Sequence, residues 1–333
     1  MGGLDLFDKV LDVILEDVGH AHNRGWASHF FRNKHRVDAL PWLNGNLADE
    51  LPESLAGAKT SRATKQFKHT LVYLPDASLQ MCISSLSRMM NRLLLVNLNN
   101  TSTKIALSDQ ERLLKKSVIP TDRLTADAVN RVLGKWVFDY AVVGSVVPSK
   151  TGIFRKKLRG RLIEVSAALD LGIGVDFPEP QSIGADRLAN AVGVTSRFGA
   201  PAVVVDFGTA VTFDIISQSR KYIGGVIAPG LGAMTEYLYQ RTALLPRIDL
   251  SEPTNIIGKS TKEAMLAGAV FGYRGLVRQI VTEIVGKLEG KAHIVATGSY
   301  ASLIAAKLPE LQIVDPDLTL EGLRIIALRN TPL

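Results

Sequence analysis

The feature that most constrains the fold is a pair of apolar runs on either side of one short polar turn. Residues 202–205 lead to Asp206 and the turn, and a β-branched run over 211–216 leads away from it. Apolar runs of this length, separated by turn residues, predict strand–turn–strand. The turn combines one carboxylate and one glycine with the hydroxyls of Thr209 and Thr212.

This combination of residues predicts a phosphate-binding turn. Glycine lets the backbone approach a ligand closely, and the exposed N–H groups of such turns can cradle phosphate oxygens. A carboxylate beside a phosphate needs a cation between them, so a metal ion is expected as well. The pattern D-x-G-T recurs by chance, however, and an ordinary hairpin remains the alternative on this evidence.

A second hairpin of the same kind occurs earlier in the chain. Residues 93–107 repeat the order of apolar strand, polar turn and strand, about 110 residues before the first hairpin described. Asn97 takes the place of Asp206, and Thr101 falls close to the place of Thr209. Two similar hairpins at this separation predict two related domains that face one another.

The remaining sequence from residue 122 alternates helical and strand patterns. One predicted helix, 184–199, opens with Gly184 and carries Asp186 and Arg187 on its first turn. A carboxylate at that place is favourable to the helix dipole, which by itself is a sufficient reason for Asp186. We expect further helices at 122–134, 150–159, 233–241, 262–285, from 301, and at 319–329, and further strands at 140–147, 162–165, 293–297 and 311–314.

Composition narrows the class of protein. The 333 residues contain one cysteine, Cys82, so the chain forms no intrachain disulfide, which fits a reducing cytoplasm. The longest apolar runs fall short of a membrane helix, and the acidic N-terminus does not match a signal peptide. The net charge of +7 is scattered except at 155–161, without interleaved aromatic residues. We therefore expect no nucleic-acid or membrane partner, and an anionic substrate instead.

Residues 1–89 differ from the rest of the chain. They contain five of the six histidines and the single cysteine, and their acidic and basic residues balance. An amphipathic helix is expected at 4–17 and a loop or weakly ordered stretch at 40–70. Because the strand pattern starts just after Met90, the segment is interpreted either as an appended module or as the result of a start assigned too early.

From Met90 to Asn330 the sequence resembles the type III pantothenate kinases. The similarity is carried by an ordered series of motifs: NLNNTSTK (97–104), GADR (184–187), DFGTAVTFD (206–214), GGVIAPGL (224–231), RTALLP (241–246), GKSTKEAMLAG (258–268), TGSYA (297–301) and DLTLEGL (317–323). The resemblance implies an α/β fold with two ribonuclease-H-like (actin-like ATPase) domains, 90–201 and 202–333, that face each other across a nucleotide cleft.

The same resemblance implies an activity and its partners. The family transfers the γ-phosphoryl group of ATP to pantothenate, giving 4′-phosphopantothenate for coenzyme A biosynthesis, with Mg²⁺ and a monovalent cation, K⁺ or NH₄⁺. It is homodimeric, and we expect a cytoplasmic homodimer here. Phosphoryl transfer mainly requires neutralised phosphate charge and an in-line hydroxyl, which two facing loops and a carboxylate can provide.

Roles for individual residues also follow from the resemblance. Asp186 is the expected general base, Asp206 the ligand of the monovalent cation, and Thr209 and Gly298 contacts of the nucleotide. The pantothenate site is expected to comprise Phe177, Gly184, Ala185, Asp186, Arg187 and Thr261. The first phosphate loop is expected to bind ATP through Asn97, Leu98, Asn99, Asn100, Thr101, Ser102, Thr103 and Lys104.

Three positions depart from the family pattern. The first loop of the family reads close to D-x-G-N-T, whereas this chain has Asn97 for the aspartate and Asn99 for the glycine. Phe177 stands where a substrate-facing tyrosine is usual. Because Asn97 lacks the charge that would organise Mg²⁺, the alternative function is a catalytically weak or inactive homologue that acts as a binding or transcription accessory protein.

Overall fold

The computed structural model describes residues 92–158 and 162–331. The chain divides into two units, Met1–Ser87 and Arg88–Leu333, and the described residues all belong to the second. The expectations for residues 1–89, including the helix at 4–17, lie outside the described residues.

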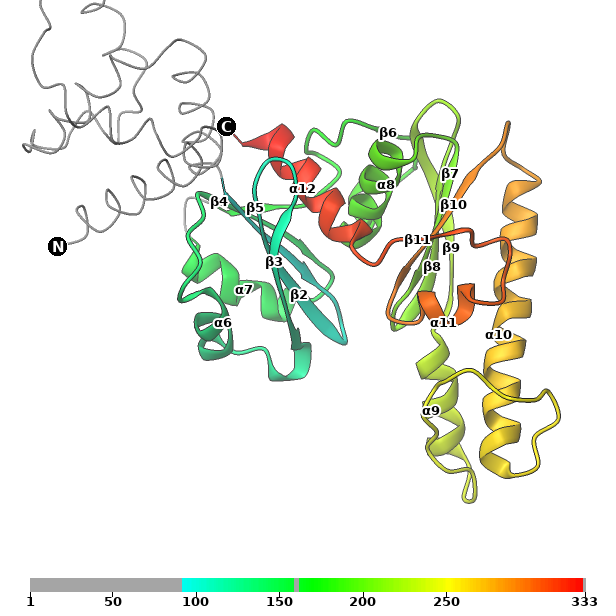
Figure 1. Cartoon of the computed structure of the whole chain (residues 1–333). Helices are drawn as coiled ribbons and strands as arrows, with labels where there is room; N and C mark the ends of the chain where they lie inside the picture. Colours follow the sequence, from blue (N-terminus) through cyan, green and yellow to red (C-terminus); the bar gives the residue numbers. More distant parts are fainter. Residues whose placement is uncertain (1–91, 159–161, 332–333) are drawn as a thin grey trace, which may run out of the picture. The chain divides into compact units, whose positions relative to one another are not determined.

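The chain forms one sheet with strands β1–β5 and then a second with strands β6–β11, each accompanied by helices (Figure 1). The first part comprises β1 (Leu93–Leu98), β2 (Ser102–Ser108), β3 (Leu113–Pro120), the 3₁₀ turn η1 (Thr121–Arg123), α6 (Ala126–Leu133), β4 (Tyr140–Ser145), α7 (Pro148–Lys157), β5 (Leu162–Glu164), β6 (Gly174–Val175), η2 (Pro180–Ser182) and α8 (Ala185–Arg197). The second comprises β7 (Ala202–Phe207), β8 (Ala210–Ile216), β9 (Lys221–Pro229), α9 (Leu231–Arg241), α10 (Thr261–Val285), β10 (His293–Gly298), α11 (Ala301–Ala305), β11 (Ile313–Val314) and α12 (Leu318–Asn330).

The two sheets have the same topology. One has the order β3-β2-β1-β4-β5, and the other the order β9-β8-β7-β10-β11 with β6 added beside β9. In each, the first hairpin is antiparallel, whereas β1 pairs with β4, and β7 with β10, in parallel. This 3-2-1-4-5 order with one reversed strand is the ribonuclease-H-like arrangement, so the predicted α/β fold with two related halves is confirmed.

Each hairpin strand contributes side chains to two different layers, because successive side chains point to opposite faces of a sheet. On β7, Val203, Val205 and Phe207 belong to the core that includes buried residues of α10. Val204 belongs instead to the core that contains the apolar residues of α8 and α12. Asp206 follows Val204 in this alternation and therefore shares its face of the sheet.

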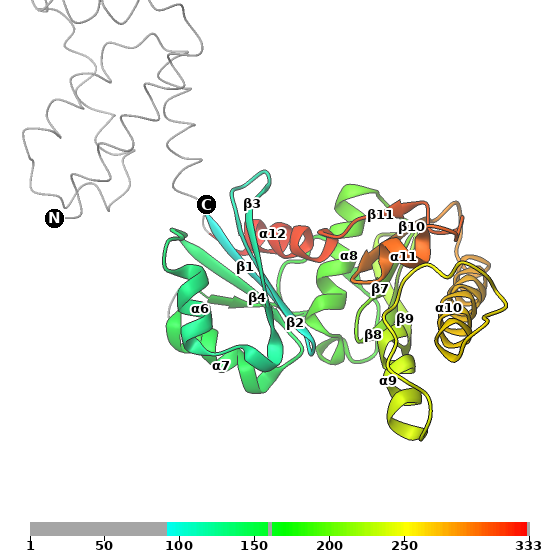
Figure 2. The same ribbon diagram turned by 60° about the horizontal axis from the view of Figure 1, so that its bottom comes forward.

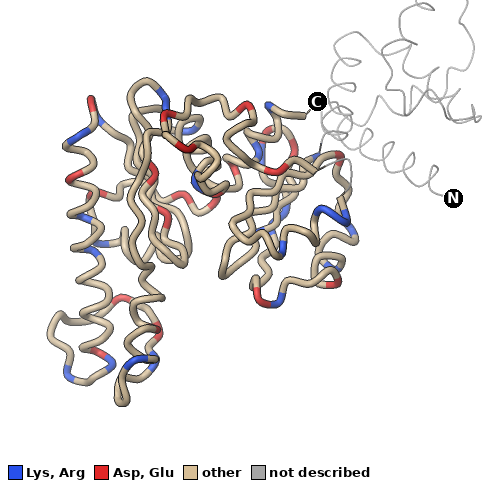
Figure 3. The backbone as a smooth tube through the Cα atoms, turned by 180° about the vertical axis from the view of Figure 1, so that it is seen from behind, with Lys and Arg blue, Asp and Glu red and all other residues tan. Residues whose placement is uncertain are grey.

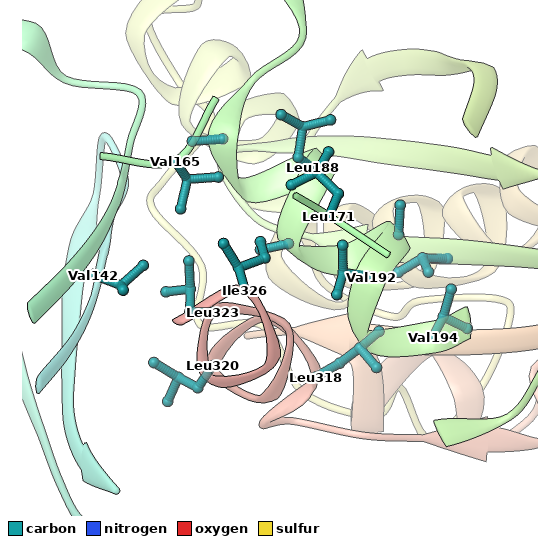
Figure 4. Close-up of a cluster of buried hydrophobic side chains, with 14 of the residues drawn as sticks. Val142, Val165, Leu171, Leu188, Val192, Val194, Leu318, Leu320, Leu323 and Ile326 are labelled. Atoms are coloured by element: carbon teal, nitrogen blue, oxygen red, sulfur yellow. The ribbon is translucent and has the colours of Figure 1, made fainter. Parts of the chain in front are cut away.

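Helices α8 and α12 lie between the two sheets, as the two ribbon views show (Figures 1 and 2). Helix α12, at the end of the described chain, contacts β1 and β4 of the first sheet, whereas α8 contacts β7 and β8 of the second. Their apolar side chains form one continuous core, in which Leu188 and Val192 of α8 lie near Leu318 and Ile326 of α12 (Figure 4). This helix pair joins the two sheets.

Neither a membrane-spanning helix nor a separation of basic from acidic residues is found in the described part of the chain. None of the helices among residues 92–158 and 162–331 is long and apolar enough to cross a membrane. Lysine and arginine are interspersed with aspartate and glutamate along the backbone (Figure 3). The basic run at the end of α7 is partly neutralised, because Arg155 pairs with Glu164.

Candidate active site

The register of the strands gathers polar side chains at the carboxyl ends of β1 and β7. Asp206 on β7 is level with Thr297 on β10 and with Thr212 on β8. In the first sheet, Asn97 on β1 is level with Lys104 on β2 and with Gly144 on β4. Residues level with one another share a face of the sheet, so each group lies on the face that carries the α8 and α12 core.

The first loop presents two amide oxygens without partners. Asn97 is 2% exposed, and its Oδ1 finds no hydrogen-bond partner among residues 92–158 and 162–331. Asn99 Oδ1 is likewise buried and unpaired within the described part of the chain. A buried acceptor without a partner is costly, so these two oxygens are places where a ligand or a hydrated ion would supply the missing donor.

Not every residue of the expected first loop directs its side chain to this place. Leu98 is fully buried in the core on the other face of the sheet. Thr103 is also buried, and its hydroxyl is 3.0 Å from that of Thr121. Asn100 is exposed. Leu98 and Thr103 are therefore limited to backbone contacts with a ligand, whereas Lys104 lies on the face of Asn97.

The two polar turns meet although they are far apart in sequence. The Oγ1 atoms of Thr101 and Thr209, from residues separated by 108 positions, are 2.6 Å apart. Gly230 packs closely against the second turn, because a β-carbon at this position would lie 2.3 Å from the carbonyl oxygen of Thr209. The structure thus brings both predicted phosphate loops to one place, with hydroxyl groups between them.

Asp206 lies beside the second loop in a crowded setting. Its Oδ2 accepts a hydrogen bond from Asn190 Nδ2 at 3.0 Å. A β-carbon at Gly298 would lie 2.6 Å from Asp206 Oδ1, and Gly298 has φ = +91°. Burial raises the pKa of Asp206, against opposing effects of the Asn190 hydrogen bond and the positive charge of Lys104. Lys104 of the first sheet therefore acts electrostatically on a carboxylate of the second.

The start of α8 carries the expected base. Gly184 is the N-cap residue, and a β-carbon there would lie 2.6 Å from Asp186 Oδ1, so the carboxylate folds over the helix terminus. Its Oδ1 accepts a hydrogen bond from the Arg187 N–H at 2.9 Å. Burial, followed by the nearby carboxylate of Asp206, raises the pKa of Asp186 above its ordinary value. A carboxylate with a raised pKa is a better general base than an exposed one.

Arg187 is held by a residue that the sequence analysis did not assign to the site. Its Nε donates to Asp214 Oδ1 at 2.6 Å, and Asp214 is fully buried. The guanidinium also lies over the ring of Tyr222, 5.7 Å from its centroid. Phe177 packs edge-on against the same ring, with centroids 6.2 Å apart. Phe177 and Arg187, both expected in the pantothenate site, therefore meet at Tyr222.

Two signals in the sequence point to the missed residues. Asp214 is a lone charge inside the apolar run of β8, and Asn190 is a lone amide on the apolar face of α8. Burial raises the pKa of Asp214 to about 7 despite the opposing charge of Arg187. A polar residue in an otherwise buried strand or helix face needs a specific partner, and that need was the available signal.

Ala185 and Thr261, two residues expected in the pantothenate site, are not part of the cluster around Tyr222. Ala185 is buried, and its β-carbon lies 3.7 Å from where a β-carbon of Gly144 would be. Thr261 is exposed at the start of α10, where it lines an apolar groove of about 820 Å³ between α9 and α10. Within the described residues, no hydrogen bond joins Thr261 to Asp186 or Arg187.

The donor set of the site fits a hard cation held by few protein ligands. No group of three or more His, Cys, Asp or Glu side chains is arranged to hold a metal ion in the described part of the chain. What the site offers is the Asp206 carboxylate, threonine hydroxyls and the two unpaired amide oxygens. Oxygen donors of this kind suit Mg²⁺ or a monovalent cation whose remaining ligands are phosphate oxygens and water.

Comparison with known proteins connects this geometry with one family. The family model described as type III pantothenate kinase matches residues 93–283. A curated type III pantothenate kinase of Akkermansia muciniphila is 49% identical over 235 residues, covering 70% of this chain and 97% of that protein. Another, from Methylacidiphilum infernorum, is 42% identical, covering 70% of this chain and 87% of that protein.

A more distant curated relative belongs to the same family. A type III pantothenate kinase of Geobacter sulfurreducens is 36% identical over 72% of this chain and 99% of its own length. Among solved structures, MreB 5 of Spiroplasma citri bound to AMPPNP aligns over 71% of this chain and 95% of that chain, at 8% identity and a TM-score of 0.42. The assignment rests on the sequence relatives, not on this structural likeness.

Proposed function

This chain belongs to the type III pantothenate kinase family, a family of ATP-dependent kinases. We propose that it transfers the γ-phosphoryl group of ATP to pantothenate. The product is 4′-phosphopantothenate. The observation that carries the proposal is the meeting of the two phosphate loops at Thr101 and Thr209, beside the carboxylates Asp186 and Asp206.

In this proposal Asp186 accepts the proton of the attacking hydroxyl. Its position at the N-terminus of α8 and its raised pKa support this role. The proton leaves the primary hydroxyl of pantothenate as the bond from that oxygen to phosphorus forms and the bond to the ADP oxygen breaks. Little covalent work is required of the protein, because positioning and charge neutralisation provide most of the rate.

The phosphates are proposed to lie between the two loops. The hydroxyls of Thr101 and Thr209, the Lys104 ammonium and backbone N–H groups of both turns are the available donors. Asn97 and Asn99 would hold the water shell of Mg²⁺ through their unpaired oxygens, and Asp206 would hold the monovalent cation. Bound cations of this kind supply charge neutralisation on the phosphate oxygens.

Pantothenate is proposed to bind on the α8 side of the cleft. Gly184, Ala185 and Arg187 would line this side, and Phe177 would contribute an apolar surface next to Tyr222. The buried Arg187 Nη2 has no hydrogen-bond partner among the described residues, so one donor of the guanidinium is unsatisfied at this place. Gly298, where a β-carbon would lie 2.6 Å from Asp206 Oδ1, would complete the nucleotide side.

We also propose that the protein is a homodimer. The groove between α9 and α10 is apolar, and several of its residues are large and exposed, among them Met234, Tyr237 and Leu238. An apolar surface of this kind is typical of a protein interface. A second copy on this groove would place protein near Thr261, which supports the proposed role of Thr261 in the substrate site. Residues 90–201 and 202–333 remain our proposed division into domains.

The decisive experiment measures ADP formation with ATP, Mg²⁺ and K⁺, with and without pantothenate. We expect ADP to form only when pantothenate is present, and its absence in both cases would refute the proposal. Asp186→Ala should abolish turnover while ATP still binds. Asp127→Ala is the matched control, because Asp127 is also an acid on the first turn of a helix, α6, but is exposed. Retained activity in Asp186→Ala would exclude it as the base.

The dimer is tested separately by sedimentation. Leu238→Asp places a charge in the apolar groove and should convert the dimer to monomer, with loss of activity if the substrate site is completed by the second copy. A monomeric native protein would contradict this part of the proposal. A dimeric Leu238→Asp variant would show that the interface lies elsewhere.

A further inference from the structure

One buried amide lies between two carboxylates of the second sheet, Asp206 on β7 and Asp214 on β8. Asn190 on α8 is 1% exposed. Its Nδ2 donates to Asp206 Oδ2 at 3.0 Å and, in a longer contact, to Asp214 Oδ2 at 3.4 Å. Asp206 belongs to the nucleotide and cation side, whereas Asp214 pairs with Arg187 on the pantothenate side. The two sides therefore share a single amide group.

The orientation of the Asn190 amide is fixed by a hydrogen bond to its oxygen. Thr319 on α12 donates its hydroxyl to Asn190 Oδ1 at 2.7 Å and is itself 4% exposed. An ionised carboxylate can only accept hydrogen bonds, so the NH₂ group of Asn190 must point toward Asp206. The amide oxygen of Asn190 then points toward Thr319. Without the hydroxyl, the amide oxygen would be a buried acceptor with no donor, which is unfavourable.

The close contact of α8 with α12 makes this arrangement geometrically possible. A β-carbon at Gly322 would lie 1.8 Å from the carbonyl oxygen of Ala189, and one at Gly193 would lie 2.6 Å from that of Leu318. The two helices therefore approach as closely as glycine permits. This approach brings Thr319 to Asn190 across 129 positions of sequence.

We infer that Asn190 and Thr319 are positioning residues of the active site: Thr319 fixes the Asn190 amide, and the amide holds Asp206 and Asp214 in their working orientations. The inference rests on the proposed function, since it concerns how the same site is aligned. Neither residue touches the reacting atoms. Their effect is transmitted through Asp206 to the cation and phosphates, and through Asp214 to Arg187.

The test removes only the Thr319 hydroxyl. Thr319→Val keeps the shape of the side chain, and Thr319→Ser restores the hydroxyl. Thr195→Val is the matched control, because Thr195 is also a buried threonine of the same helix pair, and its Oγ1 has no hydrogen-bond partner among the described residues. Each variant is assayed for kcat, for the KM of ATP and pantothenate, and for the K⁺ concentration at half-maximal rate.

We expect Thr319→Val to lower kcat/KM about 5- to 10-fold, in line with the loss of one buried hydrogen bond. The half-saturating K⁺ concentration should rise, and pantothenate should bind more weakly in calorimetry without ATP. Thr195→Val should match the native protein in kcat/KM, in the half-saturating K⁺ concentration and in pantothenate binding. Thr319→Ser should recover most of the kcat/KM that Thr319→Val loses. A purely structural role would lower the melting temperature and leave K⁺ dependence and pantothenate binding unchanged.

The outcomes separate this inference from the proposed function. A native protein that does not phosphorylate pantothenate refutes the proposed function. An active native protein with a Thr319→Val variant indistinguishable from Thr195→Val refutes the positioning role alone. Should Thr319→Val fail to fold, Thr319→Ala tests the same hydroxyl with a smaller side chain, and native K⁺ dependence and pantothenate binding in that variant would also overturn the inference.

Discussion

Returning a carboxylate to the first phosphate loop is the perturbation that most directly tests how this site works. Asn97→Asp changes one amide to a carboxylate of almost the same shape. The existing Oδ1 is buried and finds no partner within the described residues, so the new charge takes the place of an acceptor that is already free. Lys104 is level with it on the neighbouring strand and offsets part of the cost of burying the charge.

The size of the effect follows from the kind of contact that is gained. A hydrogen bond to a charged group is worth about 1.5–3 kcal/mol, compared with about 1 kcal/mol between neutral groups. If the carboxylate holds the water shell of Mg²⁺, the gain over the neutral amide is about 0.5–2 kcal/mol, which corresponds to about a 2- to 30-fold increase in rate or in Mg²⁺ affinity. We therefore expect Asn97→Asp to reach half-maximal rate at a lower Mg²⁺ concentration and to turn over faster.

The assay is pantothenate-dependent ADP release at a series of Mg²⁺ concentrations and constant K⁺. Asn130→Asp is the control, since it makes the same substitution at an exposed position on α6, outside the phosphate loop. It should leave the Mg²⁺ dependence unchanged. Equal Mg²⁺ dependence and equal turnover in the native protein and Asn97→Asp would refute the reasoning, because they would show that the charge at this position is irrelevant.

Three further predictions concern buried contacts. Burial raises the pKa of Asp214 to about 7, above the roughly 4 of an unfolded aspartate, so the folded chain keeps a proton that the unfolded chain loses. Its contribution to the free energy of unfolding should therefore fall between about pH 4 and 7, by at most about 1.4 kcal/mol per pH unit, and denaturation of Asp214→Asn should lack this slope. Glu252→Ala leaves the buried guanidinium of Arg274 without its 2.6 Å partner and should lower the free energy of unfolding by about 1–3 kcal/mol in urea denaturation; no loss would contradict this. Gly322→Ala places a methyl group 1.8 Å from the Ala189 oxygen and should lower the melting temperature sharply, whereas a native value would show that α8 and α12 separate freely.

The sequence predicted the hairpins well because their signal is local. An apolar run, a polar turn and a second run define the strand pairs at 93–107 and 202–216, and the structure confirms both as β1–β2 and β7–β8. Gly184 was expected to open a helix with Asp186 and Arg187 on its first turn, and α8 has this arrangement. Strand periodicity and helix capping depend on neighbours within a few residues, so they can be recognised in the amino-acid sequence.

Strand β3 shows where the local signal was too weak. Its residues, Leu113–Pro120, include adjacent lysines and are mostly partly or fully exposed, so they lack the apolar alternation of a buried strand. The segment is a strand because it pairs with β2 at the edge of the first sheet. Pairing with a partner strand is a tertiary property, and the sequence of the segment alone does not encode it.

The sequence by itself determined the family and the two loops, and its resemblance to that family suggested a base and a cation ligand, which stay predictions. Only the tertiary structure decided which side chains of distant segments meet. The hydroxyls of Thr101 and Thr209 meet across 108 positions, and Thr319 reaches Asn190 across 129. The second contact depends on the close approach of α8 and α12, and no periodicity in the chain records that distance.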